Sequence, residues 1–445
     1  MFNPKLNEVK MKKFKLKIRY GQTAIMLICL LFLGVSSTLA SDFNWRKYEG
    51  TTLRALFSKS AFSAINKKHV KQFEKLTGIK VKAEYYPSAP IRRKLVMELG
   101  AKNEDLDVFG GLMKTAYQYD KAGWLEPLDK YVNNPALTHP DYDFDDYAPR
   151  TRPIINGRLI AIGGSGNPQF LTYRKDLFQK YNIKVPTTWP ELEAAAKILK
   201  KNLPKGQFAW VARMNKENTA PFGPFLYSNN GSWLDENGKP DFNSKEAVEA
   251  ITFYGKMARE YGPPGAANIG WKEVVGAMAQ GKAAMTVEIS IFATLVWENP
   301  KRSKVAGKLG YALAPAGIPG NNKIMLPINV THISALSKKK EAAWFLVQYL
   351  TMKEQLMENK LRGAITLRGS NWQDPRWKAR DKLPGLSRLQ AEGMKIGRIG
   401  YEIPIARFTE ARPILQRVLY TAYEGGDVQK KADEAVKEIE RLIAE

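Results

Sequence analysis

Apolar and polar residues alternate along several short segments of the chain, and helix-like segments separate them. The segment 52–57 has apolar residues at every second position, and 79–85 repeats this period of two. Between these segments, Val70, Phe73 and Leu76 recur at steps of three, which is the spacing of one helix face. The alternation predicts strands, and the helical spacing predicts an amphipathic helix that connects them.

A third strand-like segment, 106–109, ends at Gly110 and Gly111. The three segments start about 27 residues apart, and a second helical pattern lies at 91–99. Strands and helices that alternate in this way predict a parallel sheet with right-handed crossovers. The fold class is therefore predicted to be α/β.

The rest of the chain continues this mixture without an internal repeat. A glycine-rich run at 163–168 predicts a flexible break between two strands. Further strands are predicted at 158–162, 170–173, 283–288, 311–314 and 330–336, and helices at 191–200, 244–261, 271–280, 341–358 and 428–443.

The first 40 residues have the features of a cleaved export signal. A leader with seven Lys or Arg and one acid precedes an apolar stretch at 23–35, which is about 13 residues long and too short to cross a bilayer. Thr38 and Ala40 are the small residues that a signal peptidase needs, so cleavage is predicted after Ala40. An uncleaved membrane anchor is the less favoured alternative.

The lone cysteine of the chain, Cys29, lies inside this predicted signal. Ile28 precedes it, where a lipid-anchored precursor would have a small residue. Translation could begin at Met1 or at Met11, since Met11 also starts a well-proportioned signal. In either case, we expect a soluble protein of the Gram-negative periplasm that begins at residue 41 and has no disulfide.

The formal net charge is +25, and it falls to about +19 without the leader. Such a positive charge can attract nucleic acid or anionic ligands. The basic residues are scattered among acids, however, and the longest basic run, 338–340, directly precedes a predicted helix. We therefore predict no nucleic-acid partner.

Two segments resemble functional motifs without completing them. The segment 276–283 is similar to a phosphate-binding loop, but Ala283 stands where Ser or Thr would hold magnesium, and helix and strand are in reversed order. The acidic run 141–145 begins like a calcium loop, but Asp146 and Arg152 replace its glycine and its glutamate. No histidine falls in a metal or nucleophile motif either, so we predict no catalytic residue, metal or cofactor.

Several longer stretches resemble family 1 of the extracellular solute-binding proteins, the maltose-binding-protein-like receptors of ABC importers. One is FEKLTGIKV, and others are GWLEPL, FLTYRKDLF, VPTTWPEL and GKAAM. A late stretch at 342–350 resembles a helix of this family, and 261–285 is similar to its sugar and polyol receptors. Together these stretches follow the family's order over nearly the whole chain after residue 40.

The resemblance implies two α/β lobes joined by hinge crossings, with a ligand cleft between them. Lobe one is expected at 42–167 plus 312–361, and lobe two at 168–311 plus 362–445. Closure of the cleft would capture a small carbohydrate, and the membrane subunits of an ABC permease would then receive it. We expect a monomer without enzymatic activity.

Residues for such a site are expected at strand ends and hinge crossings, where open α/β sheets bind ligands. Buried sugar hydroxyls need hydrogen-bond partners, and sugar rings stack on aromatic side chains. The residues chosen at strand ends are Ser58, Ser60, Tyr86, Gly111, Arg213 and Glu288, with Lys59 close to the first strand.

The crossings supply a second group of candidates, which are Asn167, Gln169, Asn329 and His332. Arg368 resembles a late arginine of the family, and Trp271 is either a stacking platform or, as we favour, a packing anchor. No aromatic residue follows the strand at 283–288 in the place where the family has one, so the stacking residue stays open.

Three alternatives stay open at this point. The first is a receptor for an anionic carbohydrate such as a uronate, which Arg213, Arg368 and the positive charge motivate. The second is a secreted carbohydrate hydrolase with paired carboxylates from distant segments. The third is a receptor that signals to a sensor protein as well as, or instead of, a permease.

Overall fold

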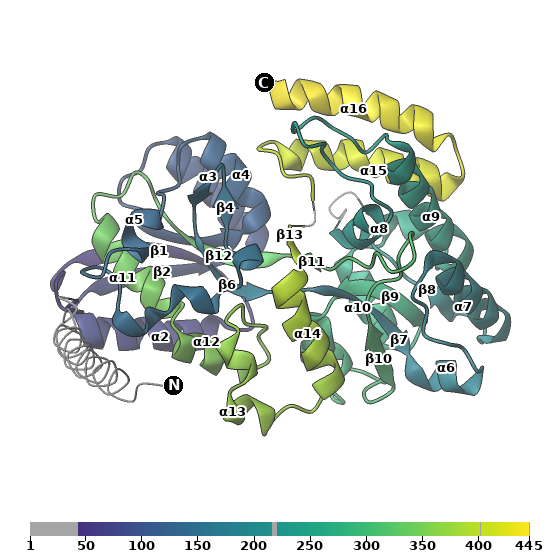
Figure 1. Cartoon of the computed structure of the whole chain (residues 1–445), viewed down its shortest axis with the longest axis horizontal. Coiled ribbons are helices and arrows are strands. Elements are labelled where there is room, and N and C mark those ends of the chain that lie inside the picture. Colours follow the sequence, from purple (N-terminus) through teal and green to yellow (C-terminus); the bar gives the residue numbers. More distant parts are fainter. Residues whose placement is uncertain (1–42, 216–219, 401, 445) are drawn as a thin grey trace, which may run out of the picture. The chain divides into compact units, whose positions relative to one another are not determined.

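The computed structural model describes residues 43–215, 220–400 and 402–444, so the predicted export signal lies outside the described residues. Residues 44–445 form one structural unit. Within this unit, two main β-sheets each carry their own helices, and we call these two parts the first lobe and the second lobe (Figure 1). The predicted α/β class is confirmed.

The sheet of the first lobe has five strands. In spatial order they are β2 (Lys80–Tyr86), β1 (Thr52–Ser58), β3 (Val108–Leu112), β12 (Ile328–Ile333) and β6 (Ile162–Gly166). The strands β1, β2 and β3 are parallel, so the predicted strand–helix alternation at the start of the chain is confirmed. The late strand β12 lies antiparallel between β3 and β6.

The sheet of the second lobe has four strands. In spatial order they are β10 (Leu309–Ala312), β7 (Gln169–Arg174), β9 (Ala283–Ile289) and β8 (Phe208–Trp210). The strand β7 is antiparallel to both of its neighbours. Two short pairs complete the strands, namely β4 (Ile154–Ile155) with β5 (Arg158–Leu159), and β11 (Met325–Leu326) with β13 (Arg398–Ile399).

Helices cover both sheets. In the first lobe they are α2 (Ser63–Thr77), α3 (Ser88–Gly100), α4 (Met113–Lys121), α5 (Asp129–Val132), α11 (Lys340–Leu350), α12 (Lys353–Lys360) and α13 (Pro375–Lys378). In the second they are α6 (Lys175–Lys180), α7 (Trp189–Asn202), α8 (Gly223–Ser228), α9 (Lys245–Tyr261), α10 (Trp271–Ala279), α14 (Pro384–Ile396), α15 (Phe408–Glu424) and α16 (Val428–Ala444). Short helical turns lie at 140–142, 144–146, 149–151, 220–222, 266–268, 293–297 and 370–372. Across the described ranges, no helix combines the length and the apolar character that a membrane crossing requires.

The core of the second lobe shows why small residues occur in its long helices. Helices α9 and α15 pack so closely at Gly255 that a Cβ there would come within 2.5 Å of Ala422. Trp210 and Trp233 fill the space beneath these helices and are almost fully buried. Close packing therefore holds α9 and α15 in fixed positions in the core of the second lobe.

The glycine-rich run at 163–166 is not the predicted flexible break, because it forms most of strand β6. A Cβ at Gly163 would lie 2.3 Å from the side chain of Leu367, and one at Gly166 would lie 2.8 Å from that of Leu326. These glycines are therefore needed for close packing beside the first crossing and not for freedom of the chain.

The helix predicted at 341–358 is interrupted, and the structure has α11 and α12 in its place. Helix α11 ends at Thr351, whose hydroxyl donates a hydrogen bond to the carbonyl oxygen of Val347 at 2.8 Å. This local bond competes with continuation of the helix. Apolar periodicity alone did not show the interruption, because it runs through both helices.

Two segments have contacts that differ from the predicted lobe boundaries. The carbonyl oxygen of Ala316 accepts a hydrogen bond from the backbone N–H of Trp189, in the second lobe. The side chain of Asn371 donates to the carbonyl oxygen of Lys353, in the first lobe. We therefore propose that the second crossing lies near residue 327, and the third near residue 380, in place of 312 and 361.

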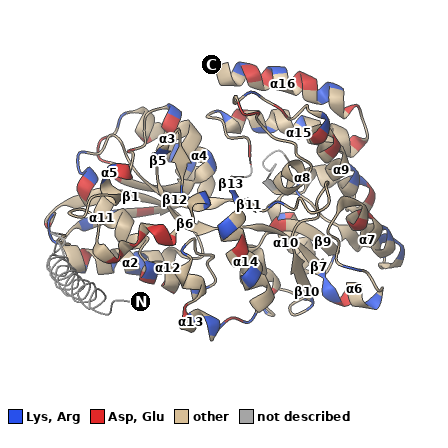
Figure 2. Ribbon diagram, viewed as in Figure 1, with Lys and Arg blue, Asp and Glu red and all other residues tan. Residues whose placement is uncertain are grey.

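Charged residues are spread over both lobes, and acids and bases alternate on helices such as α16 (Figure 2). Many of the bases pair with a nearby acid, as Arg417 does with Glu438 at 2.6 Å. The positive net charge is therefore distributed over the surface rather than gathered in one block.

Candidate functional site

Two cavities that share part of their lining lie where the strands of the first lobe end and the hinge segments cross. We call them the first chamber, of about 320 Å³, and the second chamber, of about 280 Å³. Their volumes are near the lower end of the range for small-molecule sites. The residues that line both chambers are Ser58, Ser60, Gly110, Gly111, Asn167 and Asn329.

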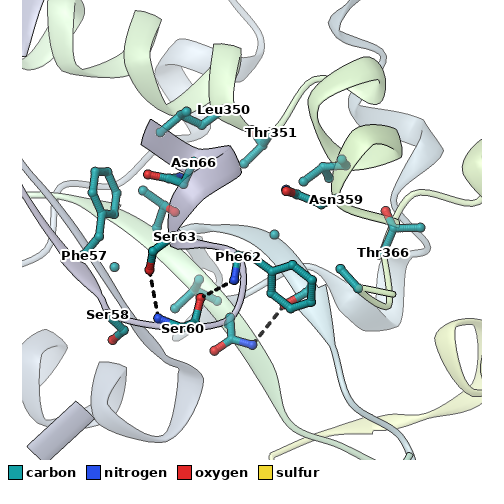
Figure 3. A pocket seen from close by; sticks show the side chains of 18 of the residues that line it. Phe57, Ser58, Ser60, Phe62, Ser63, Asn66, Leu350, Thr351, Asn359 and Thr366 are labelled. Atoms are coloured by element: carbon teal, nitrogen blue, oxygen red, sulfur yellow. Dashed lines mark hydrogen bonds between the residues drawn. The ribbon is translucent and has the colours of Figure 1, made fainter. Parts of the chain in front are cut away.

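The first chamber has a neutral lining that is rich in hydroxyl and amide groups. Asn66 on α2 and Asn359 on α12 lie on opposite sides of it (Figure 3). The Oδ1 atom of Asn359 is buried and has no hydrogen-bond partner among the described residues. None of the described residues that line this chamber carries a charge. The lining is therefore suited to uncharged hydroxyl groups.

The turn after β1 forms one wall of the first chamber. The backbone N–H of Ser60 donates to the hydroxyl of Ser63 at 2.8 Å, and the hydroxyl of Ser60 accepts from the N–H of Phe62 at 3.1 Å (Figure 3). These bonds tie the turn to the start of α2. They place the aromatic ring of Phe62 at the chamber.

Aromatic rings are also present on the β1–β2 side of the first chamber. Phe57 and Tyr85 have ring centroids 5.7 Å apart, and both line the chamber. The hydroxyl of Tyr85 donates to Oδ1 of Asn66 at 2.5 Å. Burial raises the pKa of Tyr85 to about 12, so this hydroxyl stays protonated. The chamber thus offers both stacking surfaces and hydrogen-bonding groups.

The second chamber differs in charge. Its described lining includes three cationic side chains, Lys59, Arg92 and Arg213, and no acidic one. Lys59 follows strand β1, Arg92 lies in the first turns of α3, and Arg213 follows β8. Helix α4 begins at the same place, where Thr115 and Tyr119 line the wall.

Arg213 is neutralised by a buried partner. Its guanidinium makes a two-pronged ion pair with the carboxylate of Glu288, at the end of strand β9. The carboxylate also accepts the backbone N–H of Ile289 at 2.7 Å, and the hydroxyl of Tyr254 donates to the carbonyl oxygen of Arg213 at 3.0 Å. This network holds the wall of the second lobe against the chamber.

Six of the twelve predicted site residues line the chambers. Five of them line both chambers, and Arg213 lines the second alone. Their contact with a ligand stays a prediction. The five shared residues are Ser58, Ser60, Gly111, Asn167 and Asn329.

Tyr86 and Trp271 lie outside both chamber linings. Residue 86 lies on the opposite face of β2 from Tyr85 and on the same face as Glu84. The Tyr86 hydroxyl therefore donates to Glu84, at 2.6 Å. Trp271 is 43% exposed, and its ring stacks on that of Phe292 with centroids 5.8 Å apart. It is therefore neither a lining residue nor a deeply buried anchor.

Gln169, Glu288 and His332 are buried behind the lining. Gln169 lies on β7, and Glu288 holds Arg213 as described. The Nδ1 atom of His332 lies 2.9 Å from the carbonyl oxygen of Ile160, and burial lowers the pKa of this histidine to about 4. His332 is therefore a neutral side chain of the core, close to Gly111.

Arg368 is also buried, and it belongs to neither chamber lining. Its guanidinium donates to the carbonyl oxygens of Tyr142, Asp143 and Thr351 at 2.7 to 2.8 Å. It also lies 3.5 Å from the carboxylate of Asp146. This arginine therefore joins the acidic loop to α11, and the anionic-ligand alternative loses it as an argument.

An ion cluster connects the two lobes. The Nζ atom of Lys114, on α4, lies 2.8 Å from Oε1 of Glu402, and Arg412, on α15, donates to the same carboxylate at 2.5 and 2.6 Å. Burial would raise the pKa of Glu402, but the two cations hold it below its ordinary value. The carboxylate thus stays ionised and bridges the lobes.

Sequence reasoning missed the residues of the first chamber that helices supply. Asn66 on α2 and Asn359 on α12 line it, but neither lies at a strand end, and Thr366 lines it from the segment after α12. Tyr85 could have been found, because the alternation along β2 places it on the same face as Val81 and Ala83. Arg92 had no signal, since it is one of two adjacent arginines in a helix.

Comparisons with known proteins add a family to this geometry. Residues 58–357 match the family model described as bacterial extracellular solute-binding protein. The chain is 31% identical to the mannitol-binding protein of Pseudomonas aeruginosa over 261 residues, which are 57% of this chain and 58% of that protein. It is 26% identical to the erythritol/L-threitol-binding protein of Mycolicibacterium smegmatis, over 78% of this chain and 77% of that one.

A solved structure extends the similarity to almost the whole fold. An ABC transporter solute-binding protein of Agrobacterium radiobacter, in complex with ribitol, is 28% identical to this chain. The two structures superpose with a TM-score of 0.74 over 88% of this chain and 99% of the other. The architecture of two lobes with helices on each sheet is therefore shared.

Proposed function

Because the chain belongs to the bacterial extracellular solute-binding proteins, we propose that it captures a polyol or small sugar and delivers it to an ABC importer. The proposal depends above all on the two chambers at the strand ends, lined by serine, asparagine, threonine and tyrosine. Relatives named for mannitol and erythritol, and a structure with bound ribitol, support a polyhydroxylated ligand.

The family also decides between receptor and enzyme. The relatives named above are binding proteins of this family, so this chain is not an enzyme and the hydrolase alternative is set aside. We further propose that the protein acts in the periplasm as a monomer, after cleavage behind Ala40, and that the membrane subunits of the importer are its partners.

The mechanism follows from the position of the chambers between the lobes. A hydroxylated ligand would pair with Asn167 and Asn329 at the crossings and with Asn66 and Asn359 on the helices. Such pairing avoids burying unpartnered hydroxyls, each of which costs about 1–3 kcal/mol. The ion pair between Lys114 of the first lobe and Glu402 of the second, at 2.8 Å, would then help to hold the lobes together.

Calorimetric titration of the purified protein with mannitol, ribitol, erythritol, glucose and maltose tests this function. At least one of these ligands should bind with a dissociation constant in the micromolar range or below. Substituting Asn329→Leu should weaken binding about tenfold to a hundredfold, because it removes a hydrogen-bonding group shared by both chambers.

Tyr86→Phe is the matched control, since residue 86 lies outside both chamber linings. It should leave the affinity unchanged. Absence of binding to every sugar and polyol of the panel would contradict the proposed function. Equal loss in both variants would instead contradict the location of the site.

A further inference from the structure

The two chambers differ in electrostatics as well as in position. The described lining of the first chamber contains no charged residue, whereas that of the second contains three cations and no acid. Of these, Arg213 is paired with Glu288. The difference between the chambers therefore depends on Lys59 and Arg92.

Neither Lys59 nor Arg92 has a salt-bridge partner among the described residues. Nearby cations on the same lobe behave differently. Lys94, two residues beyond Arg92 on α3, pairs with Glu98 at 2.8 Å, and Arg54 pairs with Glu84 at 2.8 Å. Cations that enclose a cleft without a carboxylate favour an anion that is supplied from outside the chain.

The surrounding backbone adds to the same potential. Helices α3 and α4 both begin at the second chamber, and neither has an acidic residue in its first turn. The positive end of each helix dipole therefore lies near Lys59 and Arg92. A neutral polyol would leave the exposed Lys59, the half-buried Arg92 and these dipoles without an anionic partner.

We propose, on the basis of the proposed function, that the ligand is a polyol or sugar derivative with one anionic end group. The hydroxylated body lies in the first chamber, and the anionic group lies in the second, against Lys59 and Arg92. A planar guanidinium such as that of Arg92 donates two parallel hydrogen bonds to a carboxylate, as in an aldonate or a uronate. A phosphate monoester offers the same charge from a different source.

Matched ligands that differ only in the end group test this proposal. Calorimetric titration would compare mannitol, mannonate and mannitol 1-phosphate, and likewise ribitol, ribonate and ribitol 5-phosphate, at low and at physiological salt. The anionic form of the preferred carbon chain should bind about tenfold to a hundredfold more tightly than the neutral form. Its affinity should fall as salt rises, while that of the neutral form should not.

The variants R92Q and K59Q should remove this preference, so that the anionic and the neutral forms bind about equally. R93Q is the matched control, because Arg93 is exposed on the same helix and lines neither chamber. Thermal unfolding without ligand would show that all three variants are folded.

Each outcome decides a specific point. Tighter binding of the carboxylate or of the phosphate, lost in R92Q but kept in R93Q, supports the proposal and identifies the source of the charge. Equal or tighter binding of the neutral forms, or an acid preference that R92Q leaves intact, overturns the proposal while the proposed function stands. Absence of detectable binding for all these ligands and for the neutral sugars overturns the proposed function, and this inference with it.

Discussion

Two buried arginines show different ways in which this protein holds a cation. Arg213, in the second lobe, is paired with the carboxylate of Glu288 beside the second chamber. Arg368, in the first lobe, is held mainly by three backbone carbonyl oxygens and lies outside both chamber linings. Both side chains are at least 90% buried.

The difference suggests a role in stability for Arg368 and a proposed role in binding for Arg213. Carbonyl oxygens belong to fixed backbone, so Arg368 connects the loop at 142–146 to the end of α11 and stabilises the lobe. A carboxylate can be removed by substitution or outcompeted by an anionic ligand, so we propose that the charge of Arg213 is adjustable at the edge of the second chamber. Substitutions that separate stability from binding test this distinction.

The largest effect is expected for Arg368→Met. The substitution leaves the carbonyl oxygens of Tyr142, Asp143 and Thr351 buried without their donor, so it should lower the free energy of unfolding by about 3–5 kcal/mol. Urea titration measures this loss. The ligand preference of protein that remains folded should be unchanged, and a shift between neutral and anionic ligands would contradict the structural role.

A somewhat smaller loss, about 2–4 kcal/mol, is expected for Glu288→Gln. The amide keeps one hydrogen bond to Arg213 but removes the neutralising charge. Unlike Arg368→Met, this substitution should strengthen the binding of anionic ligands relative to neutral ones, because the second chamber becomes more positive. Titration with a matched acid and polyol measures the ratio, and an unchanged ratio would show that Arg213 does not act on the ligand.

This comparison also shows how far the sequence could lead. The first three strands and their parallel pairing were predictable, because alternation and spacing are local signals. The same signals led to Ser58 and Gly111 at strand ends, whereas Asn167 was chosen from the crossing that the family resemblance implies. Their place in the chambers required only that the sheet forms as expected.

The two arginines and the helix residues required more than local signals. Arg213 follows a strand, and Arg368 lies in a stretch that resembles a family motif. Nothing in the neighbouring sequence shows that the first lines a chamber and that the second is held by backbone carbonyl oxygens. That difference depends on partners 75 residues away for Arg213 and 226 residues away for Arg368. Asn359 was out of reach for the same reason, because it enters the first chamber only once α12 packs against the first lobe.

The ion cluster between the lobes offers a third test, with an effect on binding rather than on folding. Glu402→Gln removes the carboxylate that receives Lys114 and Arg412, so closure should become less favourable. Affinity for any ligand should fall about tenfold, without a change of preference. Small-angle scattering with saturating ligand would show whether the lobes still close.

The pH dependence of the same cluster has a definite sign. The folded pKa of Glu402 lies below its ordinary value, so the contribution of the cluster is present at neutral pH. It is lost as the pH falls through that lowered pKa. The affinity of the wild-type protein should therefore decrease toward acid pH more than that of Glu402→Gln does, and parallel decreases would contradict the role of the cluster.

The smallest effect concerns a third buried cation, which is held neither by a carboxylate nor by carbonyl groups. Lys360, at the end of α12, is 1% exposed, and its Nζ atom lies 3.9 Å from the ring centroid of Trp377 and still closer to that of Trp372. Burial lowers the pKa of this lysine to about 7. The unfolded chain binds this proton up to about pH 10.4, so stability should rise as the pH increases from about 7 toward 10.

Lys360→Met should remove this dependence. At pH 6 the variant should be more stable than the wild type by about 1–2 kcal/mol, because the wild type must bury a charge there that has no salt-bridge partner among the described residues and only the attraction of Asp381 from beyond that distance. The difference should shrink as the pH approaches 9. If Lys360→Met is instead the less stable protein at pH 6, the faces of the two tryptophans hold the charged form, and aromatic rings would then be a third effective way to hold a cation in this fold.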